Sequence, residues 1–201
     1  MVFIGDVHGK WNQLDPLLEE YRGDEIIQVG DLGIGFPEGD LRGPDPVDFG
    51  YNFKFIRGNH DNPEACKNHC NYLGDFGVTD EGIGFISGAW SIDRIRRIHG
   101  VDWWPEEELS IIQMNAFLDL YEREKPEVMV SHDCPFFLYG DILKTYYKEP
   151  NRTATILESA FRIHQPRLWV FGHHHKRRNI TIEHTQFVCL NELDTLDTEW
   201  L

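Results

Sequence analysis

Short apolar segments recur along the chain, and five of them end directly in a cluster of polar residues. MVFI (1–4) precedes GDVHG, EIIQV (25–29) precedes GDLG, FKFI (53–56) precedes RGNHD, EVMV (127–130) precedes SHD, and RLWVF (167–171) precedes GHHH. Short apolar runs that stop at Gly, Asp, Asn or His are typical of buried strands followed by loops. The pattern therefore predicts five strands whose following loops are rich in Asp, Asn and His.

Segments with helical spacing of apolar residues lie between these strands. Leu14, Leu17, Leu18 and Tyr21 predict a helix that starts at Asp15-Pro16. The other helix starts are expected at Asn62-Pro63, at the capping box SIIQ (110–113), and at the beginning of residues 153–164. The alternation in residues 179–190 predicts a hairpin, and the Gly-, Pro- and Asp-rich residues 34–50 predict a loop near the site.

Strands that alternate with helices predict an α/β architecture. The chain has 201 residues and contains no repeat or long linker, so we expect a single domain over residues 1–201. In α/β folds, ligand-binding groups gather beyond the carboxyl ends of the strands. All five polar clusters occupy that position, so we expect them to converge on one site.

Composition narrows the class of protein. Hydrophobic residues make up 41% and charged residues 26%, as in ordinary globular proteins, and no apolar run approaches the ~18 residues of a membrane span. We expect a cytoplasmic protein with no membrane partner, because there is no leader pattern and the four cysteines do not form a disulfide-type framework. The net charge of −15 argues against stable nucleic-acid binding, which relies on basic surfaces.

The polar clusters contain a set of metal-ligand side chains. These candidates are Asp6, His8, Asp31, Asn59, His132, His173 and His175. The mixture of oxygen and nitrogen donors without a thiolate suits Mn, Fe or Zn. Seven donors are too many for one ion but suit two ions bridged by one carboxylate. With two carboxylates and a bridging hydroxide, such a centre keeps a charge of about +1, which attracts phosphate and favours phosphate-ester hydrolysis.

The ordered set GDVHG, GDLG, GNHD, SHD and GHHH resembles the calcineurin-like metallophosphoesterase superfamily over residues 5–175. The resemblance implies a two-sheet β-sandwich flanked by helices, a four-layer α/β/β/α fold. It also implies that Asp6, His8 and His175 hold one metal and that Asn59, His132 and His173 hold a second, with Asp31 bridging both.

The same resemblance implies roles for other residues. His60 would protonate the leaving oxygen or stabilise the transition state, and Asp61 would orient the His60 ring and favour its cation. The nucleophile would be the metal-bridging hydroxide. Independently of the family, Arg57 and Arg94 are candidate substrate-binding residues because guanidinium groups bind phosphate oxygens bidentately.

Several positions also have plain structural interpretations. Asp6 and Asp31 could be turn residues or helix caps, and Asp133 is either a support for His132 or a turn residue. His174 occupies a position that the family leaves variable, so we do not assign it as a ligand. Cys66, His69 and Cys70 would crowd one short helix with no fourth ligand, which favours packing over a zinc site.

The leading hypothesis is a two-metal phosphoesterase acting on a small phosphate monoester or diester, with a nucleotide as one option. Mn²⁺ is the first choice of metal, with Fe or Zn as alternatives. One competing hypothesis is a protein serine/threonine phosphatase, but GDLGIGF lacks the Asp and Arg of the GDxxDRG box of that class. A non-catalytic scaffold is the other, although this chain keeps all seven ligands and His60.

Overall fold

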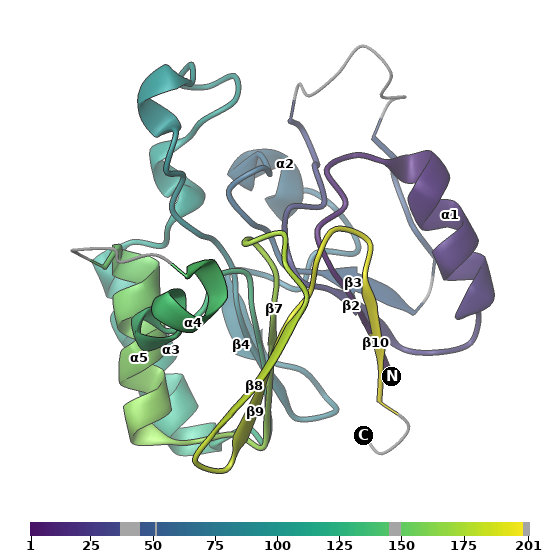
Figure 1. Ribbon diagram of the computed structural model, residues 1–201. Coiled ribbons are helices and arrows are strands. Elements are labelled where there is room, and N and C mark those ends of the chain that lie inside the picture. The colour runs from purple at the N-terminus through teal and green to yellow at the C-terminus, as the bar shows by residue number, and fades with distance from the viewer. Residues whose placement is uncertain (37–44, 51, 145–149, 199–201) are drawn as a thin grey trace.

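Two β-sheets pack face to face, and helices cover both outer faces (Figure 1). The computed structural model describes residues 1–36, 45–50, 52–144 and 150–198. One sheet has the strand order β10-β1-β2-β3 and the other β4-β5-β6-β7-β9-β8. The strands are β1 (Val2–Ile4), β2 (Ile26–Gln28), β3 (Phe53–Phe55), β4 (Phe76–Val78), β5 (Ile83–Ile86), β6 (Val128–Ser131), β7 (Leu168–Phe171), β8 (Arg178–Ile182), β9 (Thr185–Cys189) and β10 (Thr195–Asp197).

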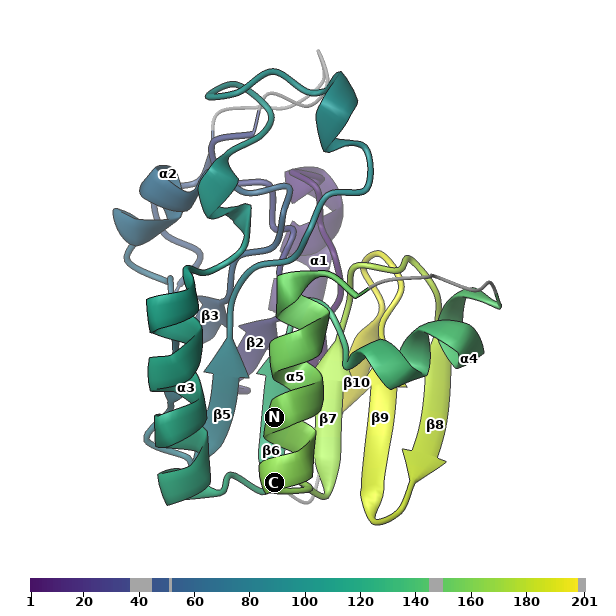
Figure 2. The same cartoon turned by 90° about the vertical axis from the view of Figure 1, so that its left-hand side faces the viewer.

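Apolar side chains fill three layers of core. The layer between the sheets joins Phe3 and Ile27 of one sheet to Val130 and Val170 of the other. Helix α1 (Trp11–Glu20) covers the outer face of the smaller sheet, while α3 (Ile111–Glu124) and α5 (Arg152–Ile163) cover the larger one (Figure 2). The shorter helices are α2 (Pro63–Lys67), α4 (Tyr139–Leu143), η1 (Arg94–Arg96), η2 (Pro105–Glu107) and η3 (Phe136–Leu138). The predicted two-sheet α/β fold with flanking helices is confirmed.

Parallel pairing brings the predicted polar loops to the same edge. Strands β1, β2 and β3 are parallel neighbours in one sheet, and β6 and β7 are parallel neighbours in the other. Their carboxyl ends therefore point the same way, and the five loops that follow them lie at the top edge of the sandwich in Figure 1. The expected convergence of the clusters follows from this topology.

The local helix signals were mostly correct, with one error. Asn62 caps α2, Ser110 and Gln113 form the capping box of α3, and β8 and β9 form the predicted hairpin. Helix α1, however, begins at Trp11, so Pro16 lies inside it. Burial of Trp11 and Leu14 against the sheet outweighs the hydrogen bond that proline removes.

Two strands lack a clear pattern in the sequence. Strand β4 has only three residues and pairs antiparallel with β5. Strand β10, with the sequence TLD, crosses back to the smaller sheet and pairs antiparallel with β1, as in Val2↔Asp197. Because β10 returns to the smaller sheet, residues 190–194 pass beside the loop that follows β1, where the Leu193 amide donates to the Asp6 carbonyl.

A long excursion after β5 rises above both sheets (Figure 2). It contains η1 and η2 and exposes Ile92, Ile95 and Ile98 to solvent. This excursion overhangs the edge at which the polar loops meet. Among the described residues, no helix combines the length and the apolar character needed to cross a bilayer.

Candidate metal centre

The residues after the strand ends share an unusual backbone conformation. His8, Asp31, His173 and His175 have φ angles of 51°, 55°, 67° and 48°. Left-handed backbone is uncommon outside glycine and is concentrated at functional sites, at a cost of about 1–3 kcal/mol per residue. Four of the seven predicted ligands therefore hold a backbone conformation that the surrounding fold must enforce.

One group of possible metal ligands comprises Asp6, His8, Asp31 and His175, whose donor atoms all lie within 4.8 Å of one another. The Nε2 atoms of His8 and His175 are 3.0 Å apart, and His175 Nε2 lies 3.1 Å from Asp6 Oδ2. Two imidazole nitrogens and two carboxylates that converge on one point match the oxygen and nitrogen donor set of a divalent cation.

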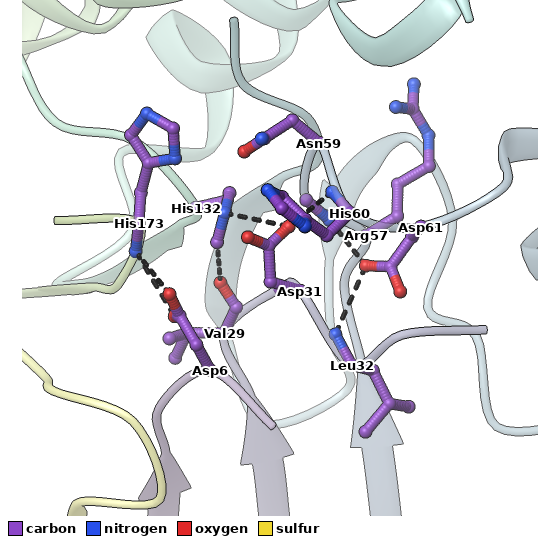
Figure 3. Close-up of polar contacts among 12 residues, drawn as sticks. Asp6, Val29, Asp31, Leu32, Arg57, Asn59, His60, Asp61, His132 and His173 are labelled. Carbon is purple, nitrogen blue, oxygen red and sulfur yellow. Dashed lines mark hydrogen bonds and ion pairs between the residues drawn. The ribbon is translucent and has the colours of Figure 1, made fainter. Parts of the chain in front are cut away.

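A second group comprises Asp31, His132 and His173, and it shares Asp31 with the first. Figure 3 shows His132 directed toward Asp31, with His173 beside this pair. Desolvation lowers the pKa of His173 to about 3. The His173 ring is therefore neutral above that pH and keeps a lone pair for a cation.

The His132 ring provides a direct test of whether the site fits a metal. Its Nδ1 donates to the Val29 carbonyl at 2.9 Å, so Nε2 carries the lone pair in the neutral ring. That nitrogen faces Asp31 Oδ1 at 3.1 Å. Burial would lower the pKa of His132, but the charge of Asp31 outweighs it and raises this pKa to about 10. A lone pair opposite a carboxylate needs a cation between them, either a proton or a metal.

Asn59 supplies an oxygen that also lacks a partner. Its Nδ2 donates to Ser91 Oγ at 3.1 Å, and Ser91 Oγ donates to Glu107 Oε2 at 2.5 Å. This chain of donors orients the amide, and Asn59 Oδ1 is buried with no hydrogen-bond partner among the described residues. An unpaired buried oxygen is costly, and a bound cation would satisfy it. The predicted role of Asn59 as a ligand fits this arrangement.

Two glycines leave room for the candidate ligands to approach one another. A Cβ atom on Gly58 would lie 2.1 Å from Asp31 Oδ1 and 2.5 Å from His132 Nε2. A Cβ atom on Gly172 would lie 2.1 Å from Asp6 Oδ1. Any side chain at either position would push a candidate ligand out of place. The glycines of the GNHD and GHHH motifs are thus required by close approach.

Glu192 supports the first group and was not foreseen from the sequence. Its Oε1 lies 3.1 Å from His175 Nδ1, and its Oε2 pairs with Lys10. A carboxylate on the far nitrogen of a ligand histidine fixes the ring and its tautomer. Glu192 follows β9 in a segment without a recognised motif, so only the tertiary structure reveals it.

His60 lies beside the first group and is contacted by an arginine. Its ring centroid is 4.9 Å from that of His8, and its backbone amide donates to Asp31 Oδ1 at 2.7 Å. Arg97 Nη2 lies 2.7 Å from His60 Nε2. Because a guanidinium only donates, His60 Nε2 is the acceptor in this contact.

Asp61 connects two of the loops that carry candidate ligands. Its carboxylate accepts hydrogen bonds from four backbone amides, those of Leu32, Gly33, Ile34 and Gly58. These bonds fasten the loop after β2 to the loop after β3. The structure thus gives Asp61 a role in holding the loops that carry Asp31 and Asn59.

The two arginines predicted to bind substrate lie in different environments. Arg57 is 2% exposed, pairs with Asp75 and donates to the Glu107 carbonyl at 3.0 Å. Figure 3 shows its guanidinium directed away from Asp31 and His132. Arg94 is exposed above the Trp90 ring and lines the cavity described below. The structure therefore places Arg94 at the site and gives Arg57 a structural role.

Asp133 organises a buried network behind the second group. Its Oδ1 lies 3.1 Å from His174 Nε2, and its Oδ2 accepts from the Tyr139 hydroxyl at 2.5 Å. Asn151 Nδ2 donates to the same Oδ2 at 3.2 Å. Although burial would raise the pKa of Asp133, its contacts with His174 and with the Tyr139 hydroxyl lower it. The network ties α4 and α5 to the strand end, which favours the supporting role over a simple turn.

Cys66, His69 and Cys70 are in none of the groups of possible metal ligands found in the part of the chain that the structure describes. Cys66 belongs to α2, and its side chain is buried in the core. His69 Nε2 contacts the Pro46 carbonyl at 2.9 Å. Packing, the expectation from the sequence, accounts for both residues. Residues 37–44 of the predicted loop (34–50) lie outside the described residues, while Phe36 of the same loop packs against His60.

A cavity of about 840 Å³ opens above both groups. Its floor contains Asp31, Asn59 and His60, and its walls come from the excursion after β5 and from the start of α5. Trp90 lines it, whereas Trp103 and Trp104 lie outside its lining. The cavity is of the size that holds a whole small molecule rather than a lone phosphate.

Comparison with known proteins gives a consistent result. A family model described as calcineurin-like phosphoesterase matches residues 1–177. The structure of TT1561 from Thermus thermophilus is similar, with a TM-score of 0.53 and 12% identity over 96% of this chain and 89% of that one. GAP50, the anchor in the inner membrane complex of Plasmodium, has a TM-score of 0.54 and 11% identity over 95% and 71%. No curated protein sequence matches this chain.

Proposed function

Because the chain belongs to the calcineurin-like phosphoesterase family, we propose that it hydrolyses a phosphate monoester or diester with two divalent cations. The position of Asp31 carries this proposal, since its carboxylate belongs to both groups of possible ligands. Asp6, His8 and His175 complete one site, and Asn59, His132 and His173 complete the other. When bound, the cations supply positive charge and a water of lowered pKa.

The protein's own residues supply the remaining chemistry. Two carboxylates, Asp6 and Asp31, leave two divalent cations with excess positive charge, so the site binds an anionic phosphate. His60 stands beside this position on the cavity floor and is placed to give a proton to the leaving oxygen. Asp61 and the Asn59–Ser91–Glu107 chain keep the participating loops fixed, which limits reorganisation during the reaction.

The donor chemistry supports a choice of metal. Imidazole and carboxylate ligands with an amide oxygen suit Mn²⁺, and Fe or Zn can occupy the same donors. None of these three metals requires a thiolate ligand. The four cysteines form no disulfide among the described residues. Free cysteines also suit the cytoplasmic location that we propose.

The cavity supports a small organic phosphate as substrate. Its volume exceeds that needed for a phosphate alone, and Trp90 offers a ring beside Arg94. A base, sugar or aryl group can pack on such a surface while the phosphate reaches the floor. A nucleotide-type substrate fits this description.

The fold alone does not separate an enzyme from a scaffold, since the similar GAP50 is described as an anchor. The side chains at the site distinguish an enzyme from a scaffold. All seven predicted ligands and His60 are present at the edge of the sandwich, and the buried Asn59 oxygen faces no partner among the described residues. This arrangement supports catalysis.

We expect the protein to hydrolyse model phosphate esters only when it holds metal. Protein stripped with a chelator and re-supplied with Mn²⁺ is assayed with p-nitrophenyl phosphate and bis-p-nitrophenyl phosphate. Turnover that appears with Mn²⁺ and disappears on chelation supports the proposal, and the ratio of the two rates separates a monoesterase from a diesterase. If folded, metal-loaded protein hydrolyses neither ester, the proposal is wrong.

A further inference from the structure

Arg97 lies in the cavity wall directly above the candidate active site. Its side chain is 9% exposed, its Nε pairs with Asp93 Oδ1 at 2.8 Å, and its Nη2 reaches His60 Nε2 at 2.7 Å. It belongs to the excursion after β5, far in sequence from the motifs that carry the ligands. A charged guanidinium is seldom buried to this extent, so its position above the site suggests a function.

The surroundings of Arg97 hold it in one orientation. Its guanidinium carbon lies 5.6 Å from the centre of the Phe36 ring, and Phe36 packs in turn against the His60 ring at 4.9 Å. Asp93 engages Nε, so the two terminal nitrogens are directed elsewhere, toward His60 and the Asp102 carbonyl. The donors are thus positioned before any ligand arrives, which lowers the entropy lost on binding.

The present partners of these donors are weak ones. An imidazole nitrogen accepts less strongly than an anionic oxygen, and the Asp102 carbonyl lies at 3.4 Å. Asp93 is 47% exposed, so water screens its pairing with the guanidinium. Arg97 therefore retains positive charge and donor capacity toward the cavity.

We propose that Arg97 binds the non-bridging oxygens of the phosphate that is cleaved, replacing its bond to His60 with bonds to those oxygens. The inference rests on the proposed function, since it assumes that a phosphate reaches the floor beside His60. A guanidinium presents its donors in a fork that matches phosphate. The exchange also releases His60 Nε2 from Arg97, so that this nitrogen can take a proton from water and give it to the leaving oxygen.

The two arginines named from the sequence, Arg57 and Arg94, are less suited to this role. Arg57 is buried with its own partners, and Arg94 is exposed over Trp90, where it can contact a more distant part of the substrate. Arg97 alone among these three contacts a residue of the candidate catalytic machinery. The predicted substrate arginine is therefore three residues further along the chain than Arg94.

The test compares Arg97→Ala and Arg97→Lys with Arg96→Ala, which removes the same charge from an exposed neighbour. Two quantities are measured on Mn²⁺-loaded protein: the Kd of inorganic phosphate by calorimetry, and KM and kcat for p-nitrophenyl phosphate. Arg97→Ala is expected to raise the phosphate Kd and the KM roughly ten- to hundredfold, the range for a lost charge-assisted contact. Arg97→Lys should give an intermediate loss, because it keeps the charge without the fork.

Arg96→Ala should leave both values unchanged. A merely structural role for Arg97 would reduce the fraction of active protein and hence kcat, with the phosphate Kd unaltered in the folded fraction. An unchanged Kd in Arg97→Ala would overturn the inference even if the wild-type protein is active. If the wild-type protein binds phosphate but hydrolyses nothing, the proposed function fails while the Kd comparison still decides the role of Arg97.

Discussion

Asp31→Asn is expected to lower metal-dependent hydrolysis roughly 10³-fold or more, because it removes the charge shared by both groups of ligands. Although burial alone would raise the pKa of Asp31, the neighbouring His132 lowers it well below its usual value. The side chain is therefore an anion under all ordinary conditions. Asparagine keeps the shape of the side chain but loses that charge.

Asp31→Asn removes the charge of this side chain and preserves its local structure. Asp31 has a φ of 55°, and asparagine tolerates this left-handed conformation. The amide oxygen of asparagine can still accept from the His60 backbone N–H, which now bonds Asp31 Oδ1 at 2.7 Å. Asp80→Asn, in the exposed turn after β4, is the matched control and should remain fully active. Mn²⁺ binding and turnover of Asp31→Asn at the wild-type level would contradict the shared role of Asp31.

His60→Ala is expected to lower kcat roughly 10²- to 10⁴-fold, the usual contribution of a general acid, and to leave metal binding intact. His60 belongs to none of the three groups of possible metal ligands found among the described residues, so its removal should not release a cation. The measurement is kcat together with the Mn²⁺ content of the purified variant. Loss of bound metal in His60→Ala would instead make His60 a ligand.

The identity of the leaving group provides a second check on His60. p-Nitrophenolate leaves without protonation far more easily than phenolate does. If His60 protonates the leaving oxygen, its replacement should slow phenyl phosphate much more than p-nitrophenyl phosphate. An equal loss on both esters would mean that His60 stabilises the transition state without transferring a proton.

The sequence was informative about the site because each ligand follows a strand. Strand ends in parallel arrangements meet at one edge, so GDVHG and GHHH become neighbours although 167 residues separate His8 from His175. Local chemistry predicted the caps at Asn62 and Ser110 equally well. These features depend only on short-range pattern and on a topology that the strand–helix alternation indicates.

Other features depend on contacts that no local pattern encodes. Glu192, the Ser91–Glu107 pair and Arg97 reach the site from the segment before β10 and from the excursion after β5, which carry no motif. The predicted start of α1 at Asp15-Pro16 was wrong, because the burial of Trp11 favours a helix that begins at Trp11. Arg57 was assigned to substrate from its position next to GNHD, but the strand carries its side chain to Asp75 instead.

The stoichiometry and position of bound metal test the central claim most directly. The protein is loaded with Mn²⁺, freed of excess ion, and examined by elemental analysis and by anomalous diffraction from crystals. We predict two Mn²⁺ ions per chain, roughly 3.5–4 Å apart, with the Asp31 carboxylate between them. A single ion per chain, or ions bound away from Asp31, would contradict the two-metal centre.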